Sequence, residues 1–224
     1  MTVAVLLNGD YEDDAWYLRR VDAARAVVAA DGGHAFLRRH GRWPDLLVGD
    51  FDSLDASLLA EARAAGVAIV EHPVRKDETD AELAVAAAAL RFGGELVLLG
   101  ALGGALDHEL GHVAVLRGLA ARGRAARLAA PGLTAAVVRG PALWRLGAAV
   151  GVRVSVLALS EGVVLTLRGL DYELTDEPLP PTVCRGLRNR VATPGARLGL
   201  AAGEALVMVF DGAAEPQPLP RDGG

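Results

Sequence analysis

Short apolar runs alternate with helix-like stretches over the first 125 residues, and this alternation restricts the fold more than any other feature. The runs are VAVLL, AVVAA, LLV, VAIV and ELVLLG, and the intervening stretches predict helices near residues 16–24, from 35, and over 56–65, 80–92 and 107–121. Strands that alternate with helices form a mainly parallel sheet covered on both faces. The sequence therefore predicts a Rossmann-like α/β domain.

The pattern changes after about residue 140. The runs VRVSVLAL, GVVLTLRGL, ARLGLAA and EALVMVF are β-rich and are separated by glycine, proline and acidic turns. Such runs predict a small antiparallel β-sandwich. We place the domain boundary near Gly140, so that residues 1–140 form the α/β domain and residues 141–212 the β-domain. Residues 213–224 are rich in proline and glycine, and we expect them to be disordered.

Composition argues against several classes of function. No apolar stretch reaches the roughly 18 residues of a membrane span, and the short first apolar run follows no basic leader, so we expect a cytoplasmic protein. The one cysteine, Cys184, excludes an internal disulfide and a cysteine-based zinc site. A net charge of −5 argues against a general nucleic-acid surface. Small molecules are the expected partners.

Five aspartates stand where the predicted strands end or the next helices begin. Asp31 comes directly after the run AVVAA, and Asp50 lies one residue beyond the run LLV. Asp52 follows Asp50 in the same loop. Asp80 and Asp107 open the helices that follow the next two apolar runs. Ligands of open α/β sheets bind at the edge formed by the carboxyl ends of the strands. We therefore expect the five carboxylates to converge on one ligand-binding edge.

Each of these positions also has a purely structural interpretation. Thr79 and Glu82 fit a capping box, and an aspartate is favoured in the first turn of such a helix. Ser53 or Asp107 could cap a helix, and Asp31 before two glycines could form a turn. Only the joint placement of these residues favours a binding site.

Two further features favour a phosphate ligand. Gly103 and Gly104 precede a predicted helix, so their backbone amides could hold a phosphate. Of the 23 lysines and arginines, Lys76 is the only lysine, and it lies in the string RKDETD. An ammonium group is a compact charge that can contact a phosphate oxygen in a tight space, although a solvated loop lysine is an equal alternative. Together with the aspartates, these residues predict a metal–nucleotide site.

The order of four short strings resembles one enzyme family, thiamine pyrophosphokinase. The strings are ADGG at 30–33, PDLLVGDFDS at 44–53, KDETDAELA at 76–84 and LGALGGALDHEL at 99–110. Each string alone is weak evidence, but all four in this order are specific. In the β-rich half, GLDYEL at 169–174 resembles the start of the family's thiamine-binding region. The resemblance covers essentially the whole chain except its tail.

The resemblance implies a homodimer with active sites between subunits, each chain pairing an ATP- and magnesium-binding α/β domain with a thiamine-binding β-sandwich. The family transfers a diphosphoryl group from ATP to the hydroxyethyl oxygen of thiamine, uses Mg²⁺ and releases AMP. By position, Asp50, Asp52 and Asp80 would hold magnesium, and with Lys76 they are the expected catalytic residues. The expected cofactor-binding residues are Asp31, Gly32, Gly33, Ser53, Thr79, Gly103, Gly104, Asp107, His108 and Asn189.

The chain departs from the family pattern at several positions. The departures are His34 and Ala35 after ADGG, Ala105 for an arginine, His112 for an asparagine, and Cys184 and Arg188 for two serines. A missing arginine removes a bidentate contact, and added arginines repel cationic thiamine unless they pair with acids. Two alternatives stay open: a diphosphokinase for another heterocyclic alcohol such as a hydroxymethyl pterin, and a non-catalytic protein that binds nucleotide or thiamine phosphate. A metal-dependent glycosyltransferase also uses Asp-x-Asp, but it does not account for the other strings.

Overall fold

The chain folds into two compact units. The computed structural model describes residues 1–51, 56–75, 77–210 and 216–218. The first unit comprises Met1–Leu119 and Gly123–Ala130, and the second Ala120–Arg122 and Pro131–Gly224. Across the described residues, the helices are all too short or too polar to cross a membrane.

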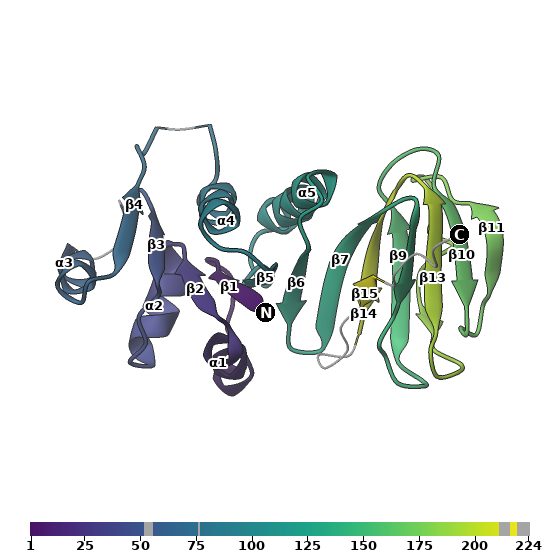
Figure 1. Ribbon diagram of the computed structural model, residues 1–224, viewed down its shortest axis with the longest axis horizontal. Coiled ribbons are helices and arrows are strands. Elements are labelled where there is room, and N and C mark those ends of the chain that lie inside the picture. Colours follow the sequence, from purple (N-terminus) through teal and green to yellow (C-terminus); the bar gives the residue numbers. More distant parts are fainter. Residues whose placement is uncertain (52–55, 76, 211–215, 219–224) are drawn as a thin grey trace. The chain divides into compact units, whose positions relative to one another are not determined.

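A parallel sheet forms the centre of the first unit (Figure 1). Its strands are β1 (Thr2–Leu6), β2 (Ala26–Ala29), β3 (Leu46–Gly49), β4 (Ala68–Glu71), β5 (Glu95–Leu99) and β6 (Ala126–Ala130). They lie in the order β6-β5-β1-β2-β3-β4, and every neighbouring pair is parallel, as the alternating sequence pattern predicts. The strand order reverses between β1 and β5, because β2 to β4 are added on one side of β1 and β5 and β6 on the other.

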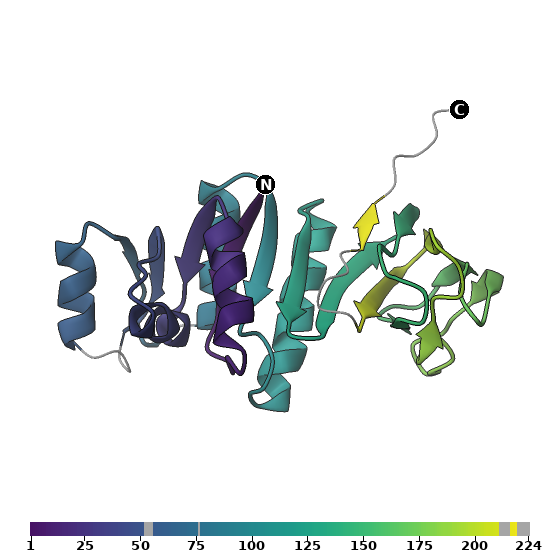
Figure 2. The same cartoon turned by 90° about the horizontal axis from the view of Figure 1, so that it is seen from below.

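Helices cover both faces of this sheet. They are α1 (Asp14–Ala23), α2 (Asp31–Arg39), α3 (Ala56–Ala64), α4 (Asp80–Arg91) and α5 (Leu106–Ala121). Figure 1 shows α4 and α5 above the strands and α1 and α2 below them, and Figure 2, seen from below, has α1 in front. On β1, Ala4 and Leu6 pack in one cluster with Trp16 of α1 and Phe36 of α2. Successive side chains of a strand point to opposite faces, so a sheet covered on both sides needs continuous apolar runs.

Helix α2 begins several residues earlier than the sequence predicts. Its first residue is Asp31, so the string ADGG contributes the first helical turn and not a turn before the helix. A Cβ on Gly32 would lie 1.7 Å from Oδ1 of Asn8, and a Cβ on Gly33 would lie 2.4 Å from the carbonyl oxygen of Leu6. Both distances are shorter than van der Waals contact, so only glycine lets the helix start this close to the end of β1.

The second unit consists of two antiparallel sheets. One contains β12 (Asn189–Arg190), β9 (Arg153–Ala158), β14 (Glu204–Val209) and β7 (Leu133–Arg139), in that order. The other contains β11 (Leu174–Pro178), β10 (Val164–Arg168), β13 (Arg197–Ala202), β8 (Ala142–Arg145) and β15 (Gln217–Pro218). Val156 and Val207 from the first sheet share one buried cluster with Leu165 and Leu198 from the second. The two sheets therefore pack face to face, as in a β-sandwich.

The two units separate earlier in the chain than the sequence predicts. The sequence places the boundary near Gly140, whereas the compact units part between Ala130 and Pro131. The strand in between, β7, pairs with β14 in antiparallel register, and its Val138 joins the core of the second unit. Because β14 comes far later in the chain, a local sequence pattern does not reveal this pairing.

Only part of the C-terminal tail is described. Within it, Gln217 and Pro218 pair with β8 opposite Arg145 and Trp144. The prediction of disorder is therefore wrong for these two residues. The remaining tail positions, 213–215 and 219–224, lie outside the described residues.

Candidate functional site

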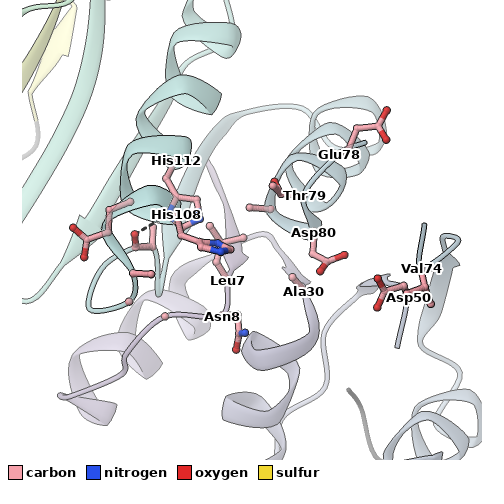
Figure 3. Close-up of a pocket in the computed structure, with 16 residues that line it drawn as sticks. Leu7, Asn8, Ala30, Asp50, Val74, Glu78, Thr79, Asp80, His108 and His112 are labelled. Atoms are coloured by element: carbon pink, nitrogen blue, oxygen red, sulfur yellow. Dashed lines mark hydrogen bonds between the residues drawn. The ribbon is translucent and has the colours of Figure 1, made fainter. Parts of the chain in front are cut away.

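A cavity of about 590 Å³ opens at the carboxyl edge of the parallel sheet (Figure 3). It is lined by Leu7, Asn8, Gly9, Ala30, Asp50, Val74, Glu78, Thr79, Asp80, Ala81, Ala101, Gly104, Ala105, His108, Glu109 and His112. These residues follow β1, β2, β3, β4 and β5 or begin α4 and α5. The cavity therefore includes the point between β1 and β5 where the strand order reverses, which is where ligands of open α/β sheets bind.

The loops after β1 and β5 continue the sheet beyond the ends of these strands. Three backbone hydrogen bonds join them, from Leu7 to Leu99 (2.9 Å), from Gly9 to Gly100 (2.8 Å) and from Asp10 to Leu102 (3.0 Å). A Cβ on Gly9 would lie 2.4 Å from the carbonyl oxygen of Gly100, so this approach requires glycine. The paired loops bring Asn8 and Ala101 to the same cavity wall.

Two of the predicted magnesium ligands, Asp50 and Asp80, lie at the β3 and α4 side of the cavity. Both are half-buried, and Asp80 is the first residue of α4. Phe51, which follows Asp50, has a φ of +57°, and its ring is buried in the cluster shared with α1 and α2. A bulky residue rarely adopts this left-handed conformation, which costs about 1–3 kcal/mol and is concentrated at functional sites. Burial of the ring thus stabilises the strained turn that carries Asp50.

Thr79 and Glu82 form the predicted capping box at the start of α4. Oγ1 of Thr79 accepts a hydrogen bond from the Glu82 N–H (3.2 Å), and Oε2 of Glu82 accepts one from the Thr79 N–H (2.8 Å). The Thr79 hydroxyl also donates a hydrogen bond to Oε2 of Glu82 (3.0 Å). Although Thr79 lines the cavity, its side chain is already used to fix the helical turn that carries Asp80.

The predicted ligand-binding residues between β5 and the first turn of α5 fall into two groups. Gly103 has a φ of +85°, and its N–H donates to Oε1 of Glu109 (2.9 Å). The amide that the sequence predicts as a phosphate donor is thus already paired, whereas Gly104 lines the cavity. Among the residues described, Asp107 is also outside the cavity lining, and its Oδ1 accepts the N–H of His108 (2.9 Å). Gly103 and Asp107 therefore shape the loop, and Gly104 and His108 reach the cavity.

His112 lies one turn after His108 on α5 and is 9% exposed. Its Nδ1 donates a hydrogen bond to the carbonyl oxygen of Ala101 (2.7 Å), because a carbonyl only accepts. Burial lowers the pKa of His112 below its ordinary value, the hydrogen bond to Ala101 opposes this, and the nearby His108 adds to the lowering. His112 is therefore neutral at pH 7, with Nε2 as the acceptor.

The structure brings some of the predicted site residues together and leaves others elsewhere. Five of them line the cavity: Asp50, Thr79, Asp80, Gly104 and His108. Asp52, Ser53 and Lys76 lie outside the described residues. Asp31, Gly32 and Gly33 form the first turn of α2, next to the cavity residue Ala30.

The carboxylates of Asp50 and Asp80 fit a hard cation such as Mg²⁺. Their oxygen atoms are the donors that Mg²⁺ prefers, and Mg²⁺ usually takes one or two carboxylates and keeps several waters. Within residues 1–51, 56–75, 77–210 and 216–218, three or more ligating side chains do not gather at one point. The described chain thus offers a pair of carboxylates rather than a complete protein cage.

Asn189 belongs to the second unit and is 5% exposed. Its Nδ2 donates to the carbonyl oxygen of Tyr172 (2.7 Å), and its Oδ1 accepts the N–H groups of Tyr172 (3.0 Å) and Arg190 (2.9 Å). The amide is therefore used within the fold, where it holds the turn at Tyr172. A contact between Asn189 and a ligand stays a prediction.

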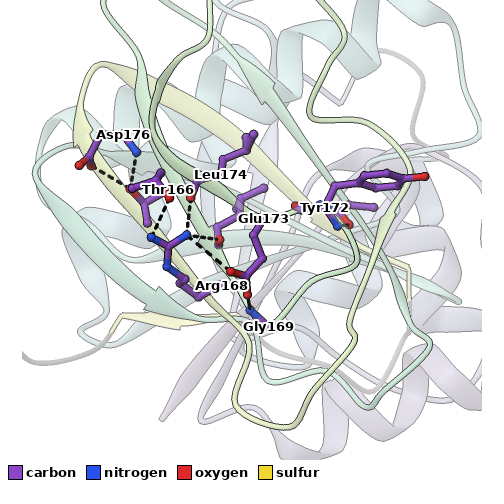
Figure 4. Close-up of polar contacts among 10 residues, drawn as sticks. Thr166, Arg168, Gly169, Tyr172, Glu173, Leu174 and Asp176 are labelled. Atoms are coloured by element: carbon purple, nitrogen blue, oxygen red, sulfur yellow. Dashed lines mark hydrogen bonds and ion pairs between the residues drawn. The ribbon is translucent and has the colours of Figure 1, made fainter.

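Other side chains fix the same turn (Figure 4). Arg168 donates to the carbonyl oxygen of Leu174 (2.8 Å) and to Oγ1 of Thr175 (2.8 Å). Oε1 of Glu173 accepts the N–H of Gly169 (2.7 Å). The string GLDYEL is therefore a braced turn.

Sequence reasoning missed several residues that line the cavity. Asn8 and Gly9 directly follow the first apolar run, which is the signal that singled out Asp50, so the same rule applied to NGD finds them. Glu109 and His112 lie one and four residues after His108, and helical spacing would have placed His112 on the same helix face. Glu78 carries no comparable signal.

Comparison with known proteins gives one family and one fold. Residues 17–127 match the family model described as thiamin pyrophosphokinase, catalytic domain. No curated protein sequence matches the chain.

Solved structures of such enzymes are similar to this chain over nearly its whole length. The structure of thiamine pyrophosphokinase from Bacillus subtilis is 21% identical with a TM-score of 0.83, covering 94% of this chain and 99% of that chain. The structure from Geobacillus thermodenitrificans is 27% identical with a TM-score of 0.77, covering 95% and 99%. The yeast structure is 14% identical with a TM-score of 0.76, covering 93% and 85%.

Proposed function

Residues 17–127 belong to the thiamin pyrophosphokinase catalytic-domain family, and we propose that this enzyme transfers a diphosphoryl group from ATP to thiamine with Mg²⁺ as cofactor. The products are thiamine diphosphate and AMP. The observation that carries the proposal is the cavity at the reversal between β1 and β5, which collects Asp50, Asp80 and Gly104 from three of the family's strings. A nucleotide site at this reversal is also what supports a Rossmann-like assignment of the sheet.

The magnesium ligands proposed are Asp50 and Asp80, with Asp52 from the same string as Asp50. The carboxylates of Asp50 and Asp80 reach the cavity from the residue after β3 and from the first turn of α4, which the capping box holds in place. Bound magnesium neutralises phosphate charge and orients the triphosphate.

The phosphates are proposed to lie against the start of α5. The first turn of a helix carries partial positive charge and free N–H groups, and Gly104 lines the cavity just before that turn. Lys76, four residues before the start of α4 in the sequence, is proposed to contact a phosphate oxygen. Further nucleotide contacts are proposed for Asp31, Gly32, Gly33 and Ser53. Asp107 and His108 are proposed to bind the nucleotide together with Gly104.

The reaction follows from this arrangement as an in-line displacement at phosphorus. The hydroxyethyl oxygen of thiamine forms a bond to the β-phosphorus, and the bond from that phosphorus to the oxygen of the α-phosphate breaks. AMP leaves with that oxygen, and the alcohol proton passes to water. Phosphoryl transfer of this kind depends on positioning and charge neutralisation rather than on a protein nucleophile.

Thiamine is the proposed acceptor, with contacts from residues 141–212. The added arginines are Arg185 and Arg188, in the string CRGLRN at 184–189, and they would repel a cation. Arg185, however, forms an ion pair with the carboxylate of Glu177. This pairing offsets its charge and supports the acceptance of a cationic substrate. We propose that the enzyme is a cytoplasmic homodimer whose active sites lie between subunits, as the family resemblance implies.

The test is AMP release from ATP and Mg²⁺ with thiamine as acceptor, and the product is identified by mass. We expect AMP and thiamine diphosphate in equal amounts. AMP release with a hydroxymethyl pterin but not with thiamine would replace the proposed acceptor.

The alternative of a non-catalytic binding protein is favoured by one observation, namely that Ala105 lines the cavity where the family has an arginine. Binding without turnover raises the melting temperature but releases no AMP. Stabilisation by ATP with no AMP from either acceptor would therefore favour this alternative.

A further inference from the structure

Two histidines face the cavity from successive turns of α5. His108 and His112 are separated by one helical turn, and both line the cavity (Figure 3). Residues four apart on a helix have Cβ atoms about 5–6 Å from each other. Both side chains enter the cavity from the same side of α5 (Figure 3). A cation between them could therefore contact both.

The ring of His112 is already oriented as a metal ligand requires. Its Nδ1 donates to the carbonyl oxygen of Ala101 at 2.7 Å, which fixes the tautomer and leaves the lone pair on Nε2. Nε2 makes no hydrogen bond with any described residue. Metal-binding histidines almost always donate their second ring N–H to a carbonyl or carboxylate in this way.

The donor type distinguishes this pair from the acidic side of the cavity. Imidazole nitrogen suits borderline cations such as Zn²⁺, whereas the carboxylates of Asp50 and Asp80 suit Mg²⁺. A third protein ligand is absent from the described residues, so water or a phosphate oxygen would complete the coordination.

The string HELGH at 108–112 also fits the H-E-x-x-H pattern of zinc peptidases, in which the glutamate is a general base. Here, however, Oε1 of Glu109 accepts the N–H of Gly103 at 2.9 Å. Glu109 therefore braces a loop, and the pair is a binding site rather than a peptidase centre.

We propose that His108 and His112 bind one zinc-type divalent cation at the α5 side of the cavity. The site is separate in residues and in donor chemistry from the carboxylates of Asp50 and Asp80. Because the same cavity is proposed to hold the substrates, bound zinc inhibits turnover; this consequence rests on the proposed function, whereas the binding does not.

The test is calorimetric titration of the full-length chain with ZnCl₂ in excess MgCl₂, which keeps the carboxylates occupied. We expect one zinc per chain, and binding at least about 10-fold weaker in His108→Ala and in His112→Asn. His72→Ala, at a half-buried histidine outside this cavity, is the matched control and should bind as the wild type does.

A variant that combines His108→Ala with His112→Asn completes the set. Equal zinc affinity in the wild type and in this double variant would overturn the proposal, as would an equal loss of affinity in His72→Ala. Circular dichroism checks the fold of each variant, and His108→Ala still decides if His112→Asn misfolds, because the His108 side chain is exposed. The titration needs no turnover, so an inactive enzyme leaves its result intact.

Discussion

Two loops, one in each unit, use the same local device for different ends. In the first unit, Gly103 has a φ of +85° and donates its N–H to Glu109; in the second, Gly169 has a φ of +75° and donates its N–H to Glu173. A glutamate thus braces a left-handed glycine in both. The first loop borders a cavity of about 590 Å³, whereas the second is closed by hydrogen bonds from Arg168 and Asn189.

The difference shows what separates a binding residue from a structural one. Asn189 and Gly104 are both predicted cofactor-binding residues, but the amide of Asn189 makes three hydrogen bonds inside its own unit. A buried polar group is stabilised when it is paired, and a paired group is less available to a ligand. Whether a polar group is already hydrogen-bonded within the fold is therefore a better guide to its role, binding or structural, than whether it belongs to a motif.

The largest effect is expected at the cavity, for Asp80→Asn. Loss of the charge removes a proposed magnesium ligand, so turnover should fall by at least about 100-fold. The melting temperature should change little, since the capping box of Thr79 and Glu82 remains. Steady-state AMP release measures this effect, with Glu71→Gln as control because Glu71 is exposed, pairs with Arg63 and is not part of the cavity. Unchanged turnover in Asp80→Asn would show that Asp80 is not a magnesium ligand needed for the reaction.

A smaller effect, of a different kind, is expected for Asn189→Ala. The substitution leaves the N–H and C=O of Tyr172 and the N–H of Arg190 without their partner, at a cost of about 2–3 kcal/mol. Urea unfolding should show this loss, with KM for thiamine nearly unchanged in the folded fraction. A raised KM at unchanged stability would instead show that Asn189 contacts the substrate, so that the turn at Tyr172 would also be part of a binding site.

The two glutamates provide a matched pair. Glu109→Gln and Glu173→Gln keep the side-chain size and the acceptor oxygen but remove the charge, so each weakens one charge-assisted hydrogen bond by about 1 kcal/mol. We expect Glu109→Gln to change KM or turnover as well as stability, because Glu109 lines the cavity. Glu173→Gln should change stability alone. Equal kinetic effects in both variants would mean that the two loops do not differ in function.

The smallest effect concerns a buried side chain that is neither paired nor in the cavity. His34 is fully buried, and its ring nitrogens have no hydrogen-bond partner among the described residues. Burial lowers the pKa of His34, and the charge of Arg38 lowers it further. The free energy of unfolding is therefore highest above the ordinary pKa of about 6.5 and decreases as the pH falls toward the lower folded-state pKa, because the unfolded chain binds the proton more readily.

His34→Leu should remove this pH dependence and stabilise the fold by about 1 kcal/mol at neutral pH. Urea midpoints at pH 7.5 and pH 5.5 measure the effect, and the half-buried His72 offers the control His72→Leu. An equally steep fall in stability between these two pH values in His34→Leu would assign the pH dependence to other groups.

The sequence predicts the parallel sheet and the meeting of Asp50 with Asp80, because the carboxyl ends of parallel strands share one edge whatever the details of packing. It does not predict that Gly103 is paired to Glu109, since that bond depends on the path of a loop and on a side-chain rotamer. The pairings of Asn189 with Tyr172 and of β7 with β14 join distant parts of the chain. Contacts of this kind are set by tertiary packing and leave no local pattern.

Phe51 places two demands on a single position. The backbone at φ +57° favours glycine, asparagine or aspartate, whereas the surrounding core needs a large apolar ring. Few amino acids satisfy both demands, so the turn beside Asp50 has little freedom to vary in evolution. New substrate preferences would arise more readily at Ala105, where the cavity wall is exposed and the backbone does not restrict the choice of residue.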